Sequence, residues 1–74
     1  MDISDIIKRI RSKKLMTQCE FADYLGVSFS TVNRWENRRA DPNFQALKKI
    51  KKCCEKEGIH FEYDINEVKN NEFN

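Results

Sequence analysis

The segment from Thr17 to Asn37 limits the fold more than any other part of the chain, because its pattern is typical of two short helices joined by a tight turn. Thr17 and Glu20 have the spacing of a capping box, in which each side chain accepts a hydrogen bond from the other residue's backbone amide. Gly26 ends the first helix, since glycine adopts the left-handed conformation at little cost. Ser28 begins the second helix as its N-cap. Each helix is only about two turns long, so each needs the other for stability.

One further helix is predicted on each side of this segment. The first covers about residues 3–14, is capped by Asp2, and turns inward isoleucines at helical spacing: Ile3, Ile6, Ile7 and Ile10. The last begins with Asp41 as N-cap and Pro42 in the first helical position, and it ends at Gly58. Its inward stripe consists of Phe44, Leu47, Ile50 and Cys54. The remaining face is rich in lysine and is interpreted as a solvated, solubilising surface.

The period of the apolar residues changes in IHFEYDI, residues 59–65. Apolar residues there alternate with polar ones, as in a half-buried strand: Ile59, Phe61, Tyr63 and Ile65. A short fifth helix is the alternative. A single strand leaves its edges unpaired, so a strand here would pair with a second copy of the chain. The expected fold is therefore all-α, a compact domain of four to five helices over residues 1–58. Residues 59–74 are expected to form a strand or short helix and a frayed tail, and to be a dimerisation segment.

Charge is distributed unevenly along the chain. Residues 1–56 carry 13 Lys and Arg against 7 Asp and Glu, a balance of +6, whereas residues 57–74 carry 1 against 5, a balance of −4. The first part therefore favours an anionic partner. No apolar run approaches the roughly 18 residues of a membrane helix. Acids precede bases at the N-terminus, the reverse of a signal peptide, so a cytoplasmic location without membrane contact is expected.

The cysteine and histidine residues do not form a catalytic pattern. The three cysteines, Cys19, Cys53 and Cys54, form neither a disulfide framework nor a zinc-binding spacing, and they are interpreted as small buried or half-buried thiols. The single histidine, His60, has no accompanying nucleophile and base. We therefore expect no enzyme activity, no cofactor, no metal site and no small-molecule effector.

The pattern from Gln18 to Asn37 resembles the helix-turn-helix of the phage Cro/repressor type, the XRE family. The positions that open the first helix, lie where the helices cross and form the turn are occupied by Gln18, Ala22 and Gly26. The family's buried positions are occupied by Phe21, Leu25, Val27, Val32 and Trp35. The family's W-E-N signature and the proline after it are matched by Trp35-Glu36-Asn37 and Pro42. The resemblance covers about residues 5–57 and implies a lambda-repressor-like domain.

This resemblance implies a DNA-binding transcriptional regulator, by expectation a repressor, whose second short helix, about residues 28–37, enters the major groove. The candidates for base contacts are Phe29, Ser30, Asn33 and Arg34. Arg can pair bidentately with guanine and Asn with adenine, Ser can donate or accept, and Phe can lie on a thymine methyl group. The candidates for phosphate contacts are Gln18, Ser28, Thr31, Asn37, Arg38 and Arg39. Alternatives stay open: core packing for Phe29, a solvated face for Asn33 and Arg34, and capping alone for Ser28.

The family also implies an internal ion pair between Arg11 and Glu36. One position departs from the family pattern: Arg38 stands where glycine usually follows W-E-N, so either Asn37 supplies the left-handed residue or the helix runs on. The expected partners are double-stranded DNA and a second copy of the chain. The alternative function is an antitoxin or protein-interaction adaptor that grips a partner through residues 59–65.

Overall fold

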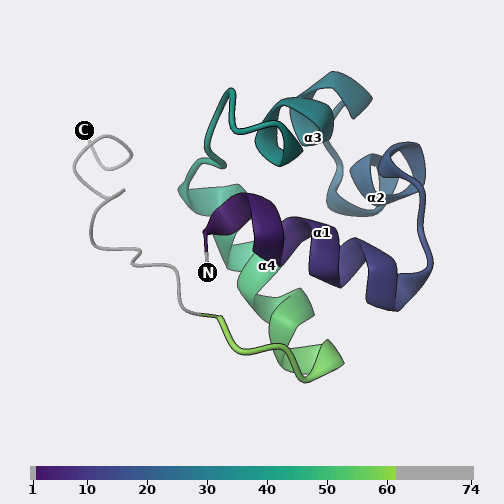
Figure 1. Ribbon diagram of the computed structural model, residues 1–74, viewed down its shortest axis with the longest axis vertical. Coiled ribbons are helices and arrows are strands. Elements are labelled where there is room, and N and C mark those ends of the chain that lie inside the picture. The colour runs from purple at the N-terminus through teal and green to yellow at the C-terminus, as the bar shows by residue number, and fades with distance from the viewer. Residues whose placement is uncertain (1, 62–74) are drawn as a thin grey trace.

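The computed structural model describes residues 2–61, which form four helices (Figure 1). The helices are α1 (Ile3–Lys14), α2 (Gln18–Leu25), α3 (Phe29–Glu36) and α4 (Phe44–Glu57). The described residues contain no strand, and the all-α prediction is confirmed. Residues 59–61 of the predicted strand are neither strand nor helix, and the rest of that segment lies outside the described residues.

Helix α1 lies at the centre of the arrangement and packs against both α3 and α4, while α2 packs against α3 (Figure 1). One apolar core joins all four helices. It consists of Ile3, Ile6, Ile7, Ile10, Phe21, Ala22, Leu25, Val32, Trp35, Ala46, Leu47, Ile50, Cys53, Cys54 and Ile59. Every helix contributes to this core, so the two short helices are held by packing more than by their own propensity.

The predicted caps of the first three helices are present. The Asp2 carboxylate accepts the Asp5 N–H at 3.0 Å. Thr17 and Glu20 form both bonds of the capping box, at 3.1 Å and 2.8 Å. Ser28 Oγ accepts the Thr31 N–H at 3.2 Å. The side chains thus satisfy amides that the first turn of a helix leaves without partners.

The prediction for the start of α4 is wrong. The N-cap is Asn43, whose side chain accepts the Ala46 N–H at 2.9 Å, and Phe44 is the first helical residue. Pro42 precedes the helix and its side chain is fully buried. Asn caps a helix as well as Asp does, so the burial of Pro42 ahead of the helix decides which residue is the cap. Phe44 is only half-buried rather than fully inward.

The exit from α3 differs from both expected geometries. Asn37 has φ −97° and ends the helix, and Arg38 takes the left-handed conformation with φ 59°. Leu15 has a similar φ of 57° after α1, although its side chain is 90% exposed. Such a conformation costs a residue with a Cβ atom about 1–2 kcal/mol. The chain therefore carries backbone strain at two turns where glycine is usual.

The cysteines differ in part from their interpretation. Cys53 and Cys54 are buried free thiols, as expected, whereas Cys19 is exposed near the start of α2. Burial raises the pKa of the Cys54 thiol to about 11, with smaller contributions from Cys53 and Glu55. Cys54 is therefore protonated at neutral pH and acts as an apolar core residue.

Candidate nucleic-acid interface

The turn between α2 and α3 is closed by backbone and side-chain contacts. Gly26, at φ 77°, donates to the Asp23 carbonyl at 3.2 Å, and the Val27 N–H donates to the Ala22 carbonyl at 2.9 Å. Lys49 of α4 donates to the Leu25 carbonyl at 2.9 Å. Ala22 is 2% exposed, which agrees with a close helix crossing that admits only a small side chain. These contacts fix the angle between α2 and α3.

Helix α3 has one buried and one exposed face. Val32 and Trp35 are buried beneath it, at 0% and 4% exposure. On the outer face Phe29 is 49% exposed, which rules out the core alternative for this residue. Ser30 and Arg34 are exposed as well. Within the described part of the chain, Arg34 has no ion-pair or side-chain hydrogen-bond partner, so its guanidinium is available to an external acceptor.

A cluster of hydroxyl groups lies at the start of α3. Ser28 Oγ is 2.8 Å from Thr31 Oγ1 and 3.1 Å from Ser30 Oγ. Ser28 is therefore the N-cap and also the centre of this cluster. A hydroxyl proton can rotate towards a new acceptor, so these groups can serve a phosphate oxygen without a change in backbone.

The ion pair between Arg11 and Glu36 is present and bidentate. Arg11 Nε lies 2.7 Å from Glu36 Oε2, and Nη2 lies 3.0 Å from Oε1. Glu36 is 3% exposed, and hydrogen bonding to its carboxylate raises the pKa of Arg11. Arg11 also donates to the Met16 carbonyl at 3.1 Å, and Ser4 Oγ donates to the Glu36 carbonyl at 2.7 Å. This buried pair joins α1, α3 and the turn after α1.

The same carboxylate orients a row of amide side chains that reaches the exposed face. Gln18 Nε2 donates to Glu36 Oε1 at 2.9 Å, and Gln18 Oε1 accepts from Asn33 Nδ2 at 3.1 Å. Asn37 Nδ2 then donates to Asn33 Oδ1 at 3.2 Å and to the Asn33 carbonyl at 2.9 Å. The structure thus brings together Gln18, Asn33 and Asn37, three predicted site residues. Their orientation is set by a residue in the core.

The two loop arginines have different surroundings. Arg38 Nε donates to Asp2 Oδ2 at 3.0 Å, and its Nη2 lies 3.3 Å from Asp5 Oδ1. The hydrogen bond from the Asp5 backbone amide lowers the pKa of Asp2, and Arg38 lowers it further. Arg39 is exposed, and its side chain forms no ion pair within residues 2–61. The guanidinium of Arg39 is therefore more available to an external anion than that of Arg38.

Sequence reasoning missed three of these contacts: the link from Gln18 to Glu36, the bond from Lys49 to α2, and the acids around Arg38. Each joins residues far apart in the chain, so no local spacing could reveal it. The uneven placement of acids at the N-terminus was the only available signal for the third.

A protein-family model described as helix-turn-helix matches residues 7–57. The chain belongs to this helix-turn-helix family, of the XRE type. Members of the family are DNA-binding transcription regulators, which agrees with the expected regulator class. This helix-turn-helix chain is 33% identical over 52 residues to the HTH-type transcriptional activator BcrR of Enterococcus faecalis. The match covers 70% of the chain and 26% of BcrR, so the chain spans about a quarter of that relative's length. No solved structure matches the helix-turn-helix chain. None of its described helices is long and apolar enough to span a membrane.

Proposed function

We propose that this helix-turn-helix chain is a sequence-specific DNA-binding regulator that places α3 in the major groove, with α2 across the DNA backbone. The observation that carries the proposal is the division of α3 into a fully buried face and an exposed face. The exposed face holds a free guanidinium, Arg34, beside Phe29 and Ser30. A helix that presents such groups to solvent can contact the hydrogen-bond donors, acceptors and methyl groups that base pairs expose in the major groove.

The proposed base contacts are made by Phe29, Ser30, Asn33 and Arg34. Arg34 is the strongest, because nothing in the described residues competes for its donors. Asn33 already bonds Gln18 and Asn37. Its side-chain amide still has one free N–H and one free lone pair, which can pair with adenine. The Asn33 side chain is therefore already oriented before it meets a base.

The proposed phosphate contacts come from both ends of the helix-turn-helix and from the loop after it: Gln18, Ser28, Thr31, Asn37, Arg38 and Arg39. These contacts position the protein without reading sequence. Arg39 and the hydroxyl cluster are accessible as they stand, whereas Arg38 would exchange Asp2 and Asp5 for a phosphate.

The finer proposal is a cytoplasmic homodimer on a palindromic site, with half-sites about 34 Å apart, that represses by occupying its operator. Occupancy alone blocks access to a promoter, so repression requires no contact beyond the DNA interface. BcrR is described as an activator. A reporter gene placed under the selected site measures whether the protein raises or lowers transcription. Increased transcription would overturn the repressor proposal.

The experiment begins with selection of a preferred site from a random duplex pool, followed by anisotropy titrations at low and high salt. Arg34→Ala should weaken binding to the selected site by about 1–3 kcal/mol and relax specificity at one base pair. Lys51→Ala, an exposed lysine on α4, is the control. Equal loss on every duplex would make Arg34 a phosphate contact. Binding that ignores salt, or no enrichment of any sequence, would contradict the proposed function.

No described residue favours the alternative adaptor function through residues 59–65. Ile59 is 6% exposed and belongs to the chain's own core. Its side chain therefore supports the fold instead of offering a contact to a partner.

A further inference from the structure

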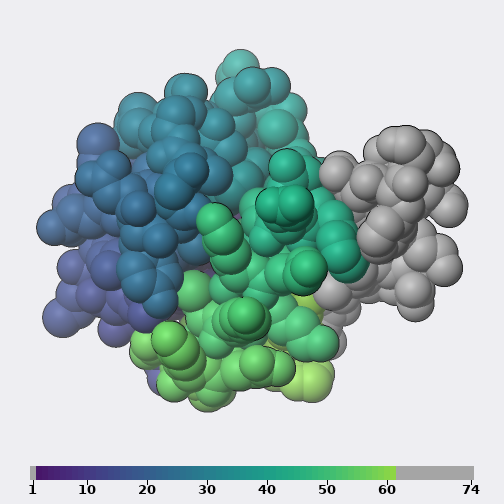
Figure 2. All heavy atoms as spheres, turned by 180° about the vertical axis from the view of Figure 1, so that it is seen from behind, coloured from purple at the N-terminus to yellow at the C-terminus, as the bar shows by residue number. Residues whose placement is uncertain are grey.

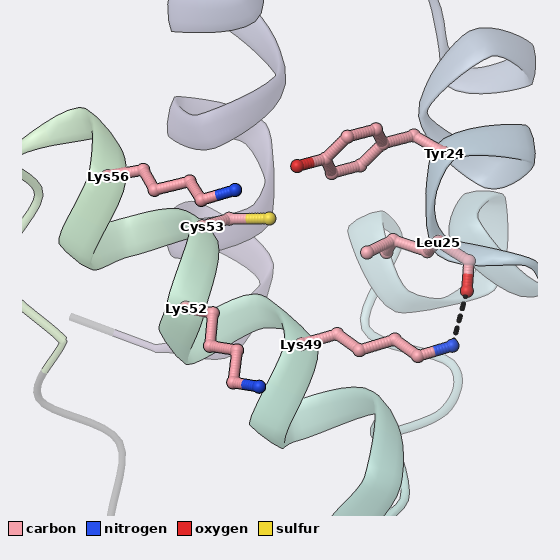
Figure 3. A pocket seen from close by; sticks show the side chains of 6 residues that line it. All are labelled: Tyr24, Leu25, Lys49, Lys52, Cys53 and Lys56. Atoms are coloured by element: carbon pink, nitrogen blue, oxygen red, sulfur yellow. Dashed lines mark hydrogen bonds between the residues drawn. The ribbon is translucent and has the colours of Figure 1, made fainter.

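A groove runs between α2 and the C-terminal half of α4, and the proposed DNA contacts do not use it (Figure 3). It has a volume of about 310 Å³ and is lined by Tyr24, Leu25, Lys49, Lys52, Cys53 and Lys56. A second hollow of about 200 Å³ continues along α4 and shares Lys49 and Lys52 with the first. Figure 2 shows side chains of α4, in green, projecting beside the blue surface of α2. The two hollows together form one continuous groove along α4.

The floor and one wall of the groove are apolar. Leu25 and Cys53 form the floor, at 2% and 3% exposure. The wall is the ring of Tyr24, 45% exposed and stacked on Phe21 with 6.4 Å between ring centroids. In Figure 3 the Tyr24 hydroxyl points across the groove towards α4. This surface suits an aromatic or branched apolar side chain.

The rim of the groove is positive. Lys52 and Lys56 are exposed on α4, and neither has a hydrogen-bond or ion-pair partner within the described residues. Lys49 is engaged with the Leu25 carbonyl, and Lys14 pairs with Glu57 at 3.2 Å. Two unpaired ammonium groups beside an apolar slot therefore call for a partner in which carboxylates alternate with apolar side chains.

We propose that this groove binds residues 62–74 of a second copy of the chain. That segment has the complementary chemistry, with four acids against one lysine: Glu62, Asp64, Glu67 and Glu72, and Lys69. Apolar side chains lie between the acids at Tyr63, Ile65 and Val68, and Phe73 follows the last acid. Opposite charge steers the segment to the rim, and the apolar side chains supply the buried contact.

The direction of the described chain selects a second copy over the segment's own groove. Gly58, at φ 70°, turns the chain at the end of α4, and the buried Ile59 anchors it there. Figure 1 shows residues 59–61 running away from α2. Residues 59–61 thus lead away from the groove, which lies between α2 and α4. Exchange between two copies fills both grooves with the same contacts, as a two-fold symmetric dimer requires.

This inference rests on the homodimer of the proposed function, and not on DNA binding by each copy. The test is the mass of the full chain by light scattering over a concentration series without DNA. The double variant Lys52→Glu/Lys56→Glu should weaken self-association by about tenfold or more. Lys51→Glu, which makes the same charge change on the same helix outside both hollows, should leave it within about twofold. Trp35 fluorescence confirms that each variant is folded.

Charge exchange makes the test specific. Glu62→Lys/Asp64→Lys/Glu67→Lys should also weaken self-association. Mixing this variant with Lys52→Glu/Lys56→Glu should restore both exchanged contacts in a mixed dimer, because the acidic tail then meets a basic groove and the basic tail meets an acidic groove. A monomer mass at every concentration would overturn the inference, as would a dimer that the groove variants leave unchanged. Loss of DNA affinity without loss of the dimer would identify the groove as a DNA contact. Intact non-specific DNA binding by a monomeric variant would leave the DNA-binding proposal standing.

Discussion

The substitution Glu36→Gln should destabilise the domain by about 3 kcal/mol, the lower end of the range for breaking a buried ion pair. The carboxylate accepts three side-chain hydrogen bonds, two from Arg11 and one from Gln18, at 2.7–3.0 Å. Glutamine has the same shape but replaces one acceptor oxygen with a donor, so one of these donors must face another donor. The lower end applies because the Arg11 side chain is 25% exposed and water can reach part of its charge.

The assay is urea unfolding followed by Trp35 fluorescence. Trp35 is the single tryptophan, is 4% exposed and precedes Glu36 directly, so its emission reports on this region. A loss of about 3 kcal/mol corresponds to roughly 12–24 °C in melting temperature for a domain of this size. Glu55→Gln, at an exposed site on α4, is the control and should change stability by less than about 0.5 kcal/mol.

A cost below about 1 kcal/mol would refute the reasoning, because that is the value of a solvated surface pair. The double variant Arg11→Met/Glu36→Leu sharpens the test. It removes both charges, so it should cost less than the sum of Arg11→Met and Glu36→Leu. Additive costs would show that the two side chains do not interact.

Three further outcomes follow from particular residues, each measured by the same unfolding assay. Leu15→Gly should stabilise the domain by about 1 kcal/mol, since the residue is 90% exposed at φ 57° and glycine removes the strain; unchanged or lower stability would contradict it. Ala22→Leu should cost roughly 1–3 kcal/mol by overpacking the α2–α3 crossing, and an unchanged midpoint would mean that the crossing has spare room. Because burial raises the pKa of Cys54 to about 11 from 9.0, the unfolded chain releases this proton first, and stability should fall between about pH 9 and pH 11. Cys54→Ala should show a shallower fall over that range, and an identical slope would exclude the thiol as the cause.

Local signals predicted most of the secondary structure. Caps act within three residues, as Thr17 and Glu20 show, and glycine turns such as Gly26 depend on the backbone of one residue. The boundaries of α1, α2 and α3 were therefore accessible from the sequence. The start of α4 was not, because Asp41 and Asn43 are equivalent caps and only the burial of Pro42 separates them.

The site divides in the same way. Amphipathic spacing places Ser30 and Arg34 on the exposed side of α3 without any knowledge of the neighbouring helices. The hydrogen-bond partners of the side chains could not be predicted in this way. Arg38 is held by two acids more than thirty positions earlier in the chain, and Gln18 bonds a carboxylate eighteen positions later. Only the packing of α1 and α2 against α3 brings these groups within hydrogen-bond distance.

The sequence by itself determined the order of the helices, the N-caps of α1, α2 and α3, the turn at Gly26 and the residues that α3 presents to solvent. These features depend on interactions within one turn of the backbone, where spacing along the chain is also distance in space. The tertiary structure alone decided the left-handed conformation of Arg38, the row of amides ordered by Glu36, and the lysine-rimmed groove between α2 and α4. Those features depend on how separate helices meet, because hydrogen bonds and hollows between them arise only when burial of the common core fixes their relative positions.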